Sequence, residues 1–492
     1  MRFSVLHFDR RANLHRSVVV FGAVAAVMAS AAFRLNAGAS VPEVMVVDMI
    51  PEVLSGEDDI NSEPNLGVNP ANPSQIAASA WMPEPMGGKT TPVFISVDGG
   101  KTWSCRSTIP VNQITCDKTL QFGGLLNMLY LTTLQNNYDL IVCRSNRLAK
   151  NSMAPVGQRP GWIDQPYIAA ATINRKDRVF IGCNDWKGRK GETATIVRSL
   201  DATGNPPARD FTAVPIEFDD PLIDSSEIRP AISADGNKVY AVFNRVISID
   251  GNTRKGDVIL VRDDDGGNSG PSSFGALRDE NGVAGFPVVK ARTFLFDDDS
   301  PALLGRDRLG GDLAIAIDPQ NANTVYLVWG ELVEGKPTLH VTRSDDSGAT
   351  WSGSLRTVTN AKNPGLAMNA NETLAFLYQQ VVTSSGGEEI WRTNLERTKD
   401  DFKNVDTKTL SWFPVSEIKI DNGQPQLGDY LHLMAVGNDF YGIFSASNVP
   451  DLSRFCCGVT FQRRFKDGKL LDLDGGEVDP SIDPFFFRVT DN

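Results

Sequence analysis

Short runs of alternating apolar and polar residues recur along most of the chain. Clear examples are Val239 to Phe243, Thr324 to Trp329 and Leu374 to Tyr378. Alternation with a period of two is the signature of a β-strand with one buried face. The 43 glycines and 28 prolines can supply the turns between many such strands. The pattern therefore predicts an all-β protein.

The strands come in repeated units. Each unit has a polar or acidic start, an alternating strand, a turn, a second apolar strand and a third strand, which in the last unit we expect at Phe461 to Arg463. Such repeats are typical of a β-propeller, a ring of four-stranded antiparallel blades. We favour seven blades, with six as the alternative. Strands near Val44 to Asp48 or Phe485 to Val489 could close the ring, and an inserted loop is expected over Asp263 to Asp299. The seven starts are Glu63, Asp117, Asp164, Glu227, Asp312, Pro364 and Asp429.

Two copies of one turn motif support this interpretation. Ser96 to Trp103 and Ser344 to Trp351 both match S-x-D-x-G-x-T-W, the Asp-box, and weaker copies stand at Asp263 to Gly267 and Ser199 to Asp201. In a hairpin turn the Asp carboxylate can accept backbone N–H bonds, and Gly supplies a positive φ. The Trp can pack under the turn. We therefore expect the motif to be structural and not catalytic.

The Asp-boxes and the short four-strand repeats resemble the BNR or sialidase superfamily over roughly residues 58–465. That superfamily includes exo-sialidases, other glycoside hydrolases and non-catalytic binding propellers. The resemblance to sialidases implies arginines that hold a substrate carboxylate, a Tyr nucleophile activated by a Glu, and an Asp acid/base. Their first arginine usually lies in an F-R-[IL]-P motif. This chain has Glu63-Pro64-Asn65 in that place and departs from the family there.

The candidate site follows from the propeller geometry, because the innermost strands all start at one mouth of the central channel. Clustered carboxyl groups there would raise one another's pKa values and supply an acid beside a base. In the alternative interpretation these acids cap turns or bind a structural cation. Tyr167 and Asp312 are expected beside the site. The predicted catalytic residues are Glu227, Tyr430, Asp164 and Asp117, and the predicted substrate-binding residues are Arg229, Arg308, Asp429 and Glu63.

The N-terminal segment predicts export. Basic residues that include Arg10-Arg11 precede the uncharged run Ser17 to Phe33, and Ala37-Gly38-Ala39 offers a cleavage site. We assign residues 1–39 to a signal peptide, of the general secretion or the twin-arginine type, and 40–492 to one propeller domain. A retained membrane anchor is the alternative. The exported chain would be periplasmic or secreted.

Charge and histidine content narrow the function. Removal of residues 1–39 takes five basic residues and one acidic residue, which leaves 43 basic against 59 acidic residues, a net charge of −16. Such a surface repels nucleic acid. Only His340 and His432 remain, which argues against a multi-histidine zinc site.

Cysteines and Asp/Gly tracts leave alternatives open. Export permits disulfides, of which Cys105–Cys116, Cys143–Cys183 and the vicinal pair Cys456-Cys457 are candidates, while buried free thiols are the alternative for the last four. The tracts Asp263 to Asn268 and Asp472 to Asp479 could bind Ca²⁺ or form solvated turns. We expect no required cofactor.

Three functions fit these features. The first is an exported glycoside hydrolase that acts on a glycan at the channel mouth. The second is a non-catalytic propeller that binds glycan or protein. The third is a polysaccharide lyase with His432 or Tyr430 as the base. In each case we expect a monomer whose partner is a carbohydrate or glycoconjugate.

Overall fold

The computed structural model describes residues 43–81, 90–110, 117–124, 126–135, 139–148, 153–188, 191–204, 211–218, 227–268, 273–297, 307–308, 312–418 and 427–491. The proposed signal peptide and Cys116 lie outside these residues. In the described part regular structure is almost entirely β-strand, so the prediction of an all-β protein is confirmed. No helix in these ranges has the length and apolar character needed to span a bilayer.

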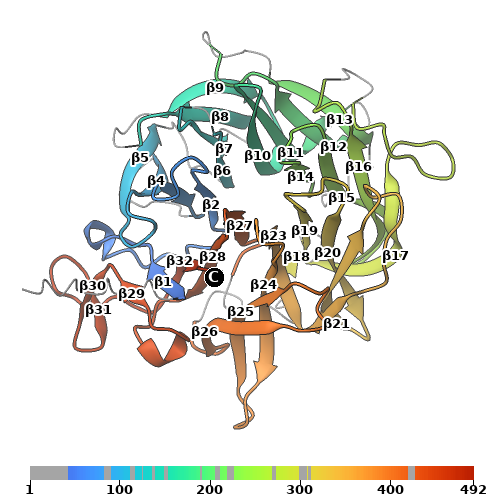
Figure 1. Ribbon diagram of the computed structural model, residues 1–492. Coiled ribbons are helices and arrows are strands. Elements are labelled where there is room, and N and C mark those ends of the chain that lie inside the picture. The colour runs from blue at the N-terminus through green and yellow to red at the C-terminus, as the bar shows by residue number, and fades with distance from the viewer. Residues whose placement is uncertain are drawn as a thin grey trace, which may run out of the picture. The chain divides into compact units, whose positions relative to one another are not determined.

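Seven antiparallel sheets stand in a ring around a central channel (Figure 1). Six of them are built from consecutive strands, with the innermost strand first in the chain, and the inner strands contact their neighbours in sequence until β27 contacts β2. The seven-bladed prediction is therefore confirmed, and six blades are excluded. Blade one is β2 (Asn65–Val68), β3 (Ile76–Ser79), β4 (Thr90–Ser96) and β5 (Ser104–Pro110); blade two is β6 (Lys118–Phe122), β7 (Leu129–Gln135), β8 (Asp139–Ser145) and β9 (Ala154–Arg159); blade three is β10 (Ile163–Ile173), β11 (Lys176–Gly188), β12 (Gly191–Ser199) and β13 (Thr212–Phe218).

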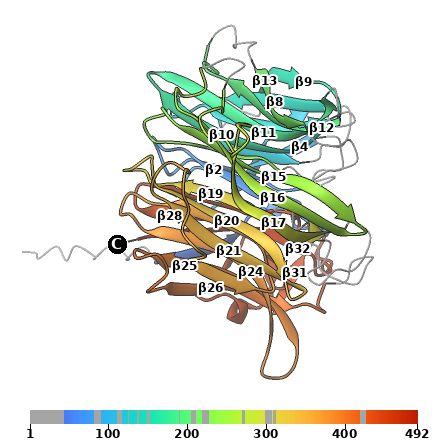
Figure 2. The same ribbon diagram turned by 90° about the vertical axis from the view of Figure 1, so that its right-hand side faces the viewer.

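The next three blades follow the same order (Figure 2). In blade four the predicted inserted loop is only partly a loop, because its second half forms the fourth strand. Blade four is β14 (Arg229–Ile232), β15 (Val239–Asp250), β16 (Thr253–Asp263) and β17 (Phe286–Asp297), extended by β18 (Asp307–Arg308); blade five is β19 (Leu313–Ile317), β20 (Val325–Val333), β21 (Lys336–Ser344) and β22 (Arg356–Thr359); blade six is β23 (Ala361–Met368), β24 (Leu374–Thr383), β25 (Glu389–Thr398) and β26 (Asp406–Pro414).

Blade seven closes the ring with both ends of the propeller domain. Its order is β27 (His432–Val436), β28 (Asp439–Ser447), β32 (Ile482–Val489) and β1 (Val44–Asp48), and β1 pairs antiparallel with β32 from Val44↔Val489 to Asp48↔Phe485. Both strands expected to close the ring are thus used.

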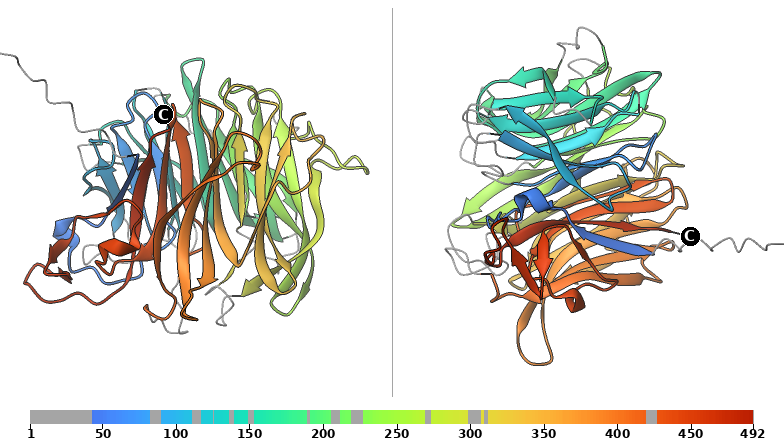
Figure 3. Two further views of the ribbon diagram at one scale, coloured as in Figure 1. Left: turned by 60° about the horizontal axis from the view of Figure 1, so that its bottom comes forward. Right: turned by 90° about the vertical axis from the view of Figure 1, so that its left-hand side faces the viewer.

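An insertion between β28 and β32 corrects the sequence prediction. The third strand of blade seven is β32 and not Phe461 to Arg463, because part of that segment forms β29 (Thr460–Phe461), which pairs in parallel with β1. The insertion projects from the side of the ring (Figure 3). Its other elements are η4 (Leu452–Arg454), β30 (Arg464–Lys466) and β31 (Lys469–Leu471), and η1 (Glu52–Leu54) follows β1.

The two S-x-D-x-G-x-T-W segments form nearly identical turns after the third strands of blades one and five. In the first, Asp98 Oδ1 accepts from Thr102 N at 3.0 Å, and in the second, Asp346 Oδ1 accepts from Thr350 N at 2.8 Å. The indole N–H of Trp103 donates to Gly100 O at 3.0 Å. Gly100 has φ 90°, and a Cβ there would lie 2.0 Å from the Phe486 ring. The predicted hydrogen bonding of these turns is confirmed.

A third turn of this kind escaped the sequence analysis. In blade six Asp400 Oδ1 accepts from Asn404 N at 2.9 Å, and Thr398 Oγ1 accepts from Phe402 N at 3.1 Å. Thr, Phe and Asn replace the Ser, Gly and Thr of the motif, and φ at Phe402 is 64°. All three turns join the third and fourth strands. They therefore lie on the face of the ring opposite to the starts of the inner strands.

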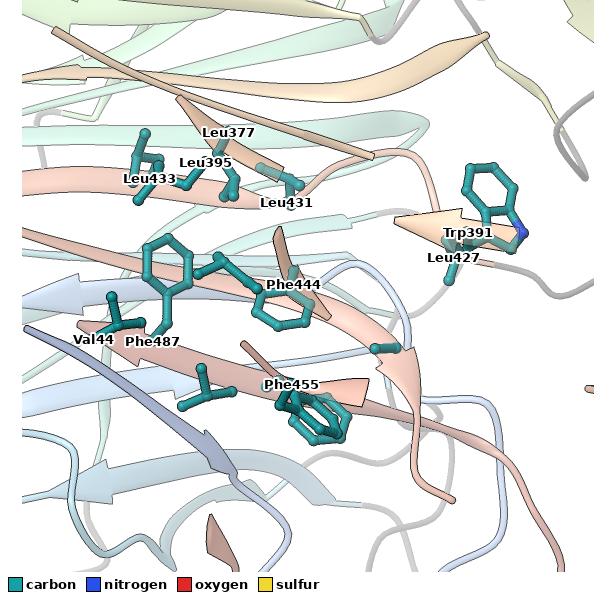
Figure 4. Packing of buried hydrophobic residues seen from close by; sticks show 14 of the residues in the cluster. Val44, Leu377, Trp391, Leu395, Leu427, Leu431, Leu433, Phe444, Phe455 and Phe487 are labelled. Carbon is teal, nitrogen blue, oxygen red and sulfur yellow. The ribbon is translucent and has the colours of Figure 1, made fainter. Parts of the chain in front are cut away.

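The core is divided among the spaces between neighbouring blades. The largest apolar cluster lies between blades six and seven and packs Phe444 against Phe485 and Phe487 at ring distances of 5.8 and 6.1 Å (Figure 4). Cys143 and Cys183 are buried free thiols in this structure, so the proposed bond between them is not formed. The sulfur atoms of Cys456 and Cys457 lie 2.9 Å apart on the surface.

Candidate functional site

The inner strands begin at one mouth of the channel, as predicted. Left-handed backbone occurs immediately before or within the first residues of several of them, at Glu63 (φ 53°), Gln165 (φ 48°), Glu227 (φ 42°) and Asn363 (φ 53°). Such conformations in residues other than Gly are strained and persist only where surrounding contacts hold them. Their clustering marks this mouth as the candidate site.

Hydrogen bonds between neighbouring blades hold the mouth together. Most partners lie on the inner strands or directly before them, and Arg292 on the fourth strand of blade four reaches Gly330 on the second strand of blade five. The ring of blades is therefore tied at this level on every side. The contacts are Leu120 N to Asn65 Oδ1 (2.9 Å), Thr119 Oγ1 to Pro166 O (3.0 Å), Gln165 Nε2 to Glu227 Oε1 (2.9 Å), Arg292 Nη1 to Gly330 O, Asn363 N to Asp312 Oδ1 (2.7 Å), Asn363 Nδ2 to Gly428 O (3.1 Å) and Asp429 N to Glu63 Oε1 (3.3 Å).

Glu227 lies in the wall between blades three and four. It is fully buried, its backbone N–H donates to Asn184 Oδ1 at 3.0 Å, and its Oε2 lies 3.5 Å from Arg229 Nη2. Asp312 is also buried and receives the backbone N–H of Asn363. These contacts are of the turn-capping kind that the alternative interpretation describes. The catalytic role of Glu227 stays a prediction.

Tyr430 is a buried predicted site residue whose pKa is affected by several other predicted residues. Its side chain is 6% exposed, and no residue of the described ranges makes a hydrogen bond to its hydroxyl group. Burial raises the pKa of Tyr430 well above its usual value, the charges of Asp117, Glu63 and Asp429 raise it further, and Arg229 opposes them. The charges that act on this phenol are thus those of three of the predicted acids and one predicted arginine.

A row of three side chains reaches across the channel beside Tyr430. The guanidinium carbon of Arg229 (blade four) lies 4.6 Å from the ring centroid of Tyr167 (blade three). The Tyr167 ring meets the imidazole of His432 (blade seven) edge to face, with centroids 5.7 Å apart. Because blades three and seven are not neighbours in the ring, this contact spans the channel.

His432 has a defined hydrogen bond and a neutral ring. Its Nδ1 lies 2.8 Å from Leu66 O and 3.4 Å from Leu66 N, and the shorter contact assigns the proton to Nδ1, which donates it to the carbonyl. Nε2 then presents a lone pair and has no hydrogen-bond partner in the described part of the chain. Burial lowers the pKa of His432 to about 4, and the positive charge of Arg229 lowers it further, while the Leu66 contact opposes the shift. Burial also raises the pKa of Tyr167 to about 12.

A cavity of about 280 Å³ continues from this row along the channel. Its wall is made by the inner strands of blades three to seven with Gln121 of blade two, and its lining begins at Tyr167, Arg229 and His432. Further along the strands the lining is mainly small or apolar, as at Ala169, Ala231 and Ala314. The polar groups are therefore concentrated at the mouth.

Three buried cations near the mouth were missed by sequence reasoning. Arg292 donates to Gly330 O and Asn244 Oδ1, and burial lowers its pKa to about 10 against the opposing effects of Asp312 and nearby glutamates. It projects from the fourth strand of its blade, so no inner-strand pattern could have found it. Lys118 and Lys362 are 2% and 3% exposed on inner strands. For Lys118 the available signal was its place directly after Asp117 at a strand start, and Lys362 has no such neighbour.

The other predicted residues stand as follows. Asp164, Asp117, Glu63 and Asp429 are half-buried at the mouth, and Asp164 Oδ1 accepts from Gln165 N at 3.0 Å. The side chain of Arg308 lies outside the described residues. In the described ranges no three His, Cys, Asp or Glu side chains are arranged to hold a metal ion. Asp263 and Asp472 accept backbone N–H groups of their own turns instead, for example from Gly267 at 2.7 Å. Binding of Ca²⁺ stays a prediction.

Known proteins resemble this chain only distantly. No protein-family model matches it, and no curated protein sequence is significantly similar. Solved structures with a similar arrangement include the phage phi92 endosialidase (12% identity, TM-score 0.40, 92% of this chain and 69% of that one) and Sqt1 from Chaetomium thermophilum (12%, 0.44, 90% and 98%). A PL25 ulvan lyase matches over 79% of this chain and 92% of its own, with 10% identity and a TM-score of 0.45.

Proposed function

We propose that this protein is an exported glycan-acting propeller of the sialidase-like kind, a glycoside hydrolase whose site is the mouth at the starts of the inner strands. The observation that carries the proposal is the row of Arg229, Tyr167 and His432 across the channel, at the start of the cavity. Tyr430 is buried close to this row in sequence, and its pKa is raised by burial and by the charges of Asp117, Glu63 and Asp429 and lowered by that of Arg229. A tyrosine beside carboxylates and a guanidinium can serve glycoside cleavage when the substrate itself is anionic.

The geometry suggests a division of roles. Arg229 would bind the carboxylate of an acidic sugar, and Glu227, 3.5 Å from its guanidinium, would keep that group in place. Tyr430 would attack the anomeric carbon while its proton passes to a neighbouring carboxylate, for which Asp117 is our choice. The raised pKa of Tyr430 makes this base necessary, because little phenolate exists at neutral pH. Asp164 would protonate the leaving oxygen.

One observation favours a second candidate, a polysaccharide lyase. His432 is neutral above about pH 4, and its Nε2 lone pair is available. In β-elimination, Nε2 would take the proton next to the carboxylate of a uronate that Arg229 neutralises. The electrons of that C–H bond would form a C=C double bond as the glycosidic oxygen leaves with a proton from Tyr430.

The test is a screen of the exported form, residues 40–492. Fluorogenic sialosides, uronides and neutral glycosides report hydrolysis by release of the fluorophore, and polyuronates report elimination by the ultraviolet absorbance of the unsaturated product. EDTA is added in a parallel series to test the Ca²⁺ prediction. A glycoside substrate supports the hydrolase, and an unsaturated product supports the lyase. Glycan binding without turnover would contradict both the hydrolase and the lyase, and it would favour a non-catalytic propeller that binds glycan.

Tyr430→Phe and Tyr240→Phe form a matched pair for any activity found. Tyr240 is a buried tyrosine on β15 whose hydroxyl donates to Ala322 O at 2.8 Å, on the face opposite to the mouth. The first variant should lose activity by two orders of magnitude or more, roughly the effect of removing a general acid, base or nucleophile. The second should keep it. Equal effects would contradict a site at Tyr430.

A further inference from the structure

Trp162 is a large, solvent-exposed aromatic side chain on the face of the ring where the inner strands start. It lies in the connection Pro160 to Trp162 between β9, the outermost strand of blade two, and β10, the innermost strand of blade three. Its side chain is 60% exposed. The next residue, Ile163, is fully buried, so the indole projects away from the apolar cluster between these blades.

The backbone of this connection is strained and anchored. Gly161 has φ 82° and Trp162 has φ 46°, which is an unusual conformation for a bulky side chain. Arg159 Nε donates to Asp185 Oδ2 at 2.7 Å, and the Gly161 amide donates to Asp139 Oδ1. These contacts fix the connection at both of its blades. The indole is therefore presented by a rigid turn, at a cost in strain that its own packing does not explain.

Trp162 also lies close to the proposed site in sequence and in space. Along β10 it is followed by Asp164 and then by Tyr167, which belongs to the row across the channel. At about 3.3 Å per residue, Trp162 and Tyr167 are at most roughly 17 Å apart. A glycan chain whose end reaches Arg229 would pass this indole on its way out of the mouth.

We propose that Trp162 is a stacking platform for a second sugar unit, so that the mouth recognises a glycan chain and not a single sugar. This inference rests on the proposed function and extends it to the length of the ligand. A flat, exposed and pre-positioned ring offers apolar area to the C–H face of a pyranose ring without ordering a mobile loop. Trp81 and Trp412 are more covered, and Arg454 lies 5.5 Å from the ring of Trp412.

The experiment is binding of the exported protein to an array of immobilised glycans of one to six sugar units. Trp162→Asn removes the ring but suits the left-handed backbone, because Asn adopts that conformation readily. It should weaken binding to glycans of two or more units by roughly tenfold and leave binding of single sugars unchanged. Trp162→Phe, which retains a ring, should restore most of the binding. Phe465→Ala removes another exposed ring, on β30, and should have no effect.

The outcomes separate the two proposals. If the wild type binds single sugars and chains but Trp162→Asn binds both as well as the wild type does, the platform is wrong and the proposed function stands. If Trp162→Asn loses affinity for single sugars and for chains by the same factor, the indole is not a second subsite. If the wild type binds no glycan of any length, the proposed function fails and the platform fails with it. The thermal unfolding temperature of each variant is also measured, and a value equal to that of the wild type shows that the fold is intact.

Discussion

Arg463 and Asp483 form an ion pair at 2.7 Å in which both side chains are fully buried. A second buried carboxyl group, that of Asp48, lies close enough for the charge of Asp483 to raise its pKa. Asp48 ends the first strand of the propeller and Asp483 is in the last, so this cluster sits where the ring closes. Two carboxyl groups with one guanidinium require a proton, because a second buried negative charge would have no partner.

The first prediction concerns pH and ring closure. Burial, followed by the charge of Asp483, raises the pKa of Asp48 well above its usual value, and burial raises that of Glu57, near Asp483 and Arg463, to about 7. The folded state therefore binds more protons than the unfolded state, and these groups make the free energy of unfolding fall as pH rises above about 4. For Glu57 this decrease in the free energy of unfolding ends near pH 7.

Asp48→Asn mimics the protonated acid and should be more stable than the wild type at pH 8, by about 1–2 kcal/mol, with the gain vanishing towards pH 4. The wild type must be compared with Asp48→Asn at each pH, because His432 affects both proteins equally. Its lowered pKa makes the free energy of unfolding rise with pH between about 4 and 6.5. Thermal unfolding from pH 4 to pH 8 measures the difference, with the exposed Asp250→Asn as control. A constant loss at every pH would contradict the shared proton.

A second prediction concerns the turns on the face opposite to the mouth. Asp346→Ala removes the acceptor for Thr350 N and for Thr350 Oγ1, the latter at 2.7 Å. We expect a loss of about 1 kcal/mol in the free energy of unfolding, comparable with the loss of a helix cap, and no direct effect on activity. Chemical denaturation measures the loss, and Asp479→Ala, an exposed acid of blade seven, is the control. Full stability of Asp346→Ala would contradict the structural role of this turn.

A third prediction concerns the row across the channel. The imidazole of His432 should titrate near pH 4, and Arg229→Met should move its pKa upward because a nearby positive charge is removed. Residues 40–492 contain only one other histidine, His340, which lies against Trp329 in blade five and serves as an internal reference. Proton NMR of the imidazole resonances gives both pKa values. An unshifted His432 in the variant would place Arg229 too far away to act on it.

The fold was largely predictable because its information is local and repeated. A period of two in the apolar residues fixes each strand, and the acid that starts every unit except the sixth fixes the phase. Blade seven was the exception. Its third strand is separated from its second by residues 448–481, and the short β29 within them pairs with β1 from the other end of the chain. No local pattern shows such a pairing.

The site was less predictable than the fold. Propeller geometry predicted one mouth for Glu63, Asp117, Asp429, Arg229 and Tyr430; the charges of the first four act on the pKa of Tyr430, and the roles of all five stay predictions. It could not show that Glu227 turns into the wall, because this depends on its left-handed backbone and on Gln165 and Asn184 of the neighbouring blade. The Tyr167–His432 contact was equally hidden, since it joins blades on opposite sides of the channel. The third turn at Thr398 to Asn404 was hidden because other residues make the same hydrogen bonds.

The central claim is that the mouth around Arg229 and Tyr430 binds an acidic glycan. The most direct measurement is calorimetric titration of residues 40–492 with the acidic oligosaccharide that binds best on the array, compared with the same titration of Arg229→Met. The account predicts that the variant keeps its fold and loses at least tenfold in affinity for the acidic ligand, while a neutral glycan of the same length is unaffected. Undiminished binding of the acidic ligand by Arg229→Met would contradict the account.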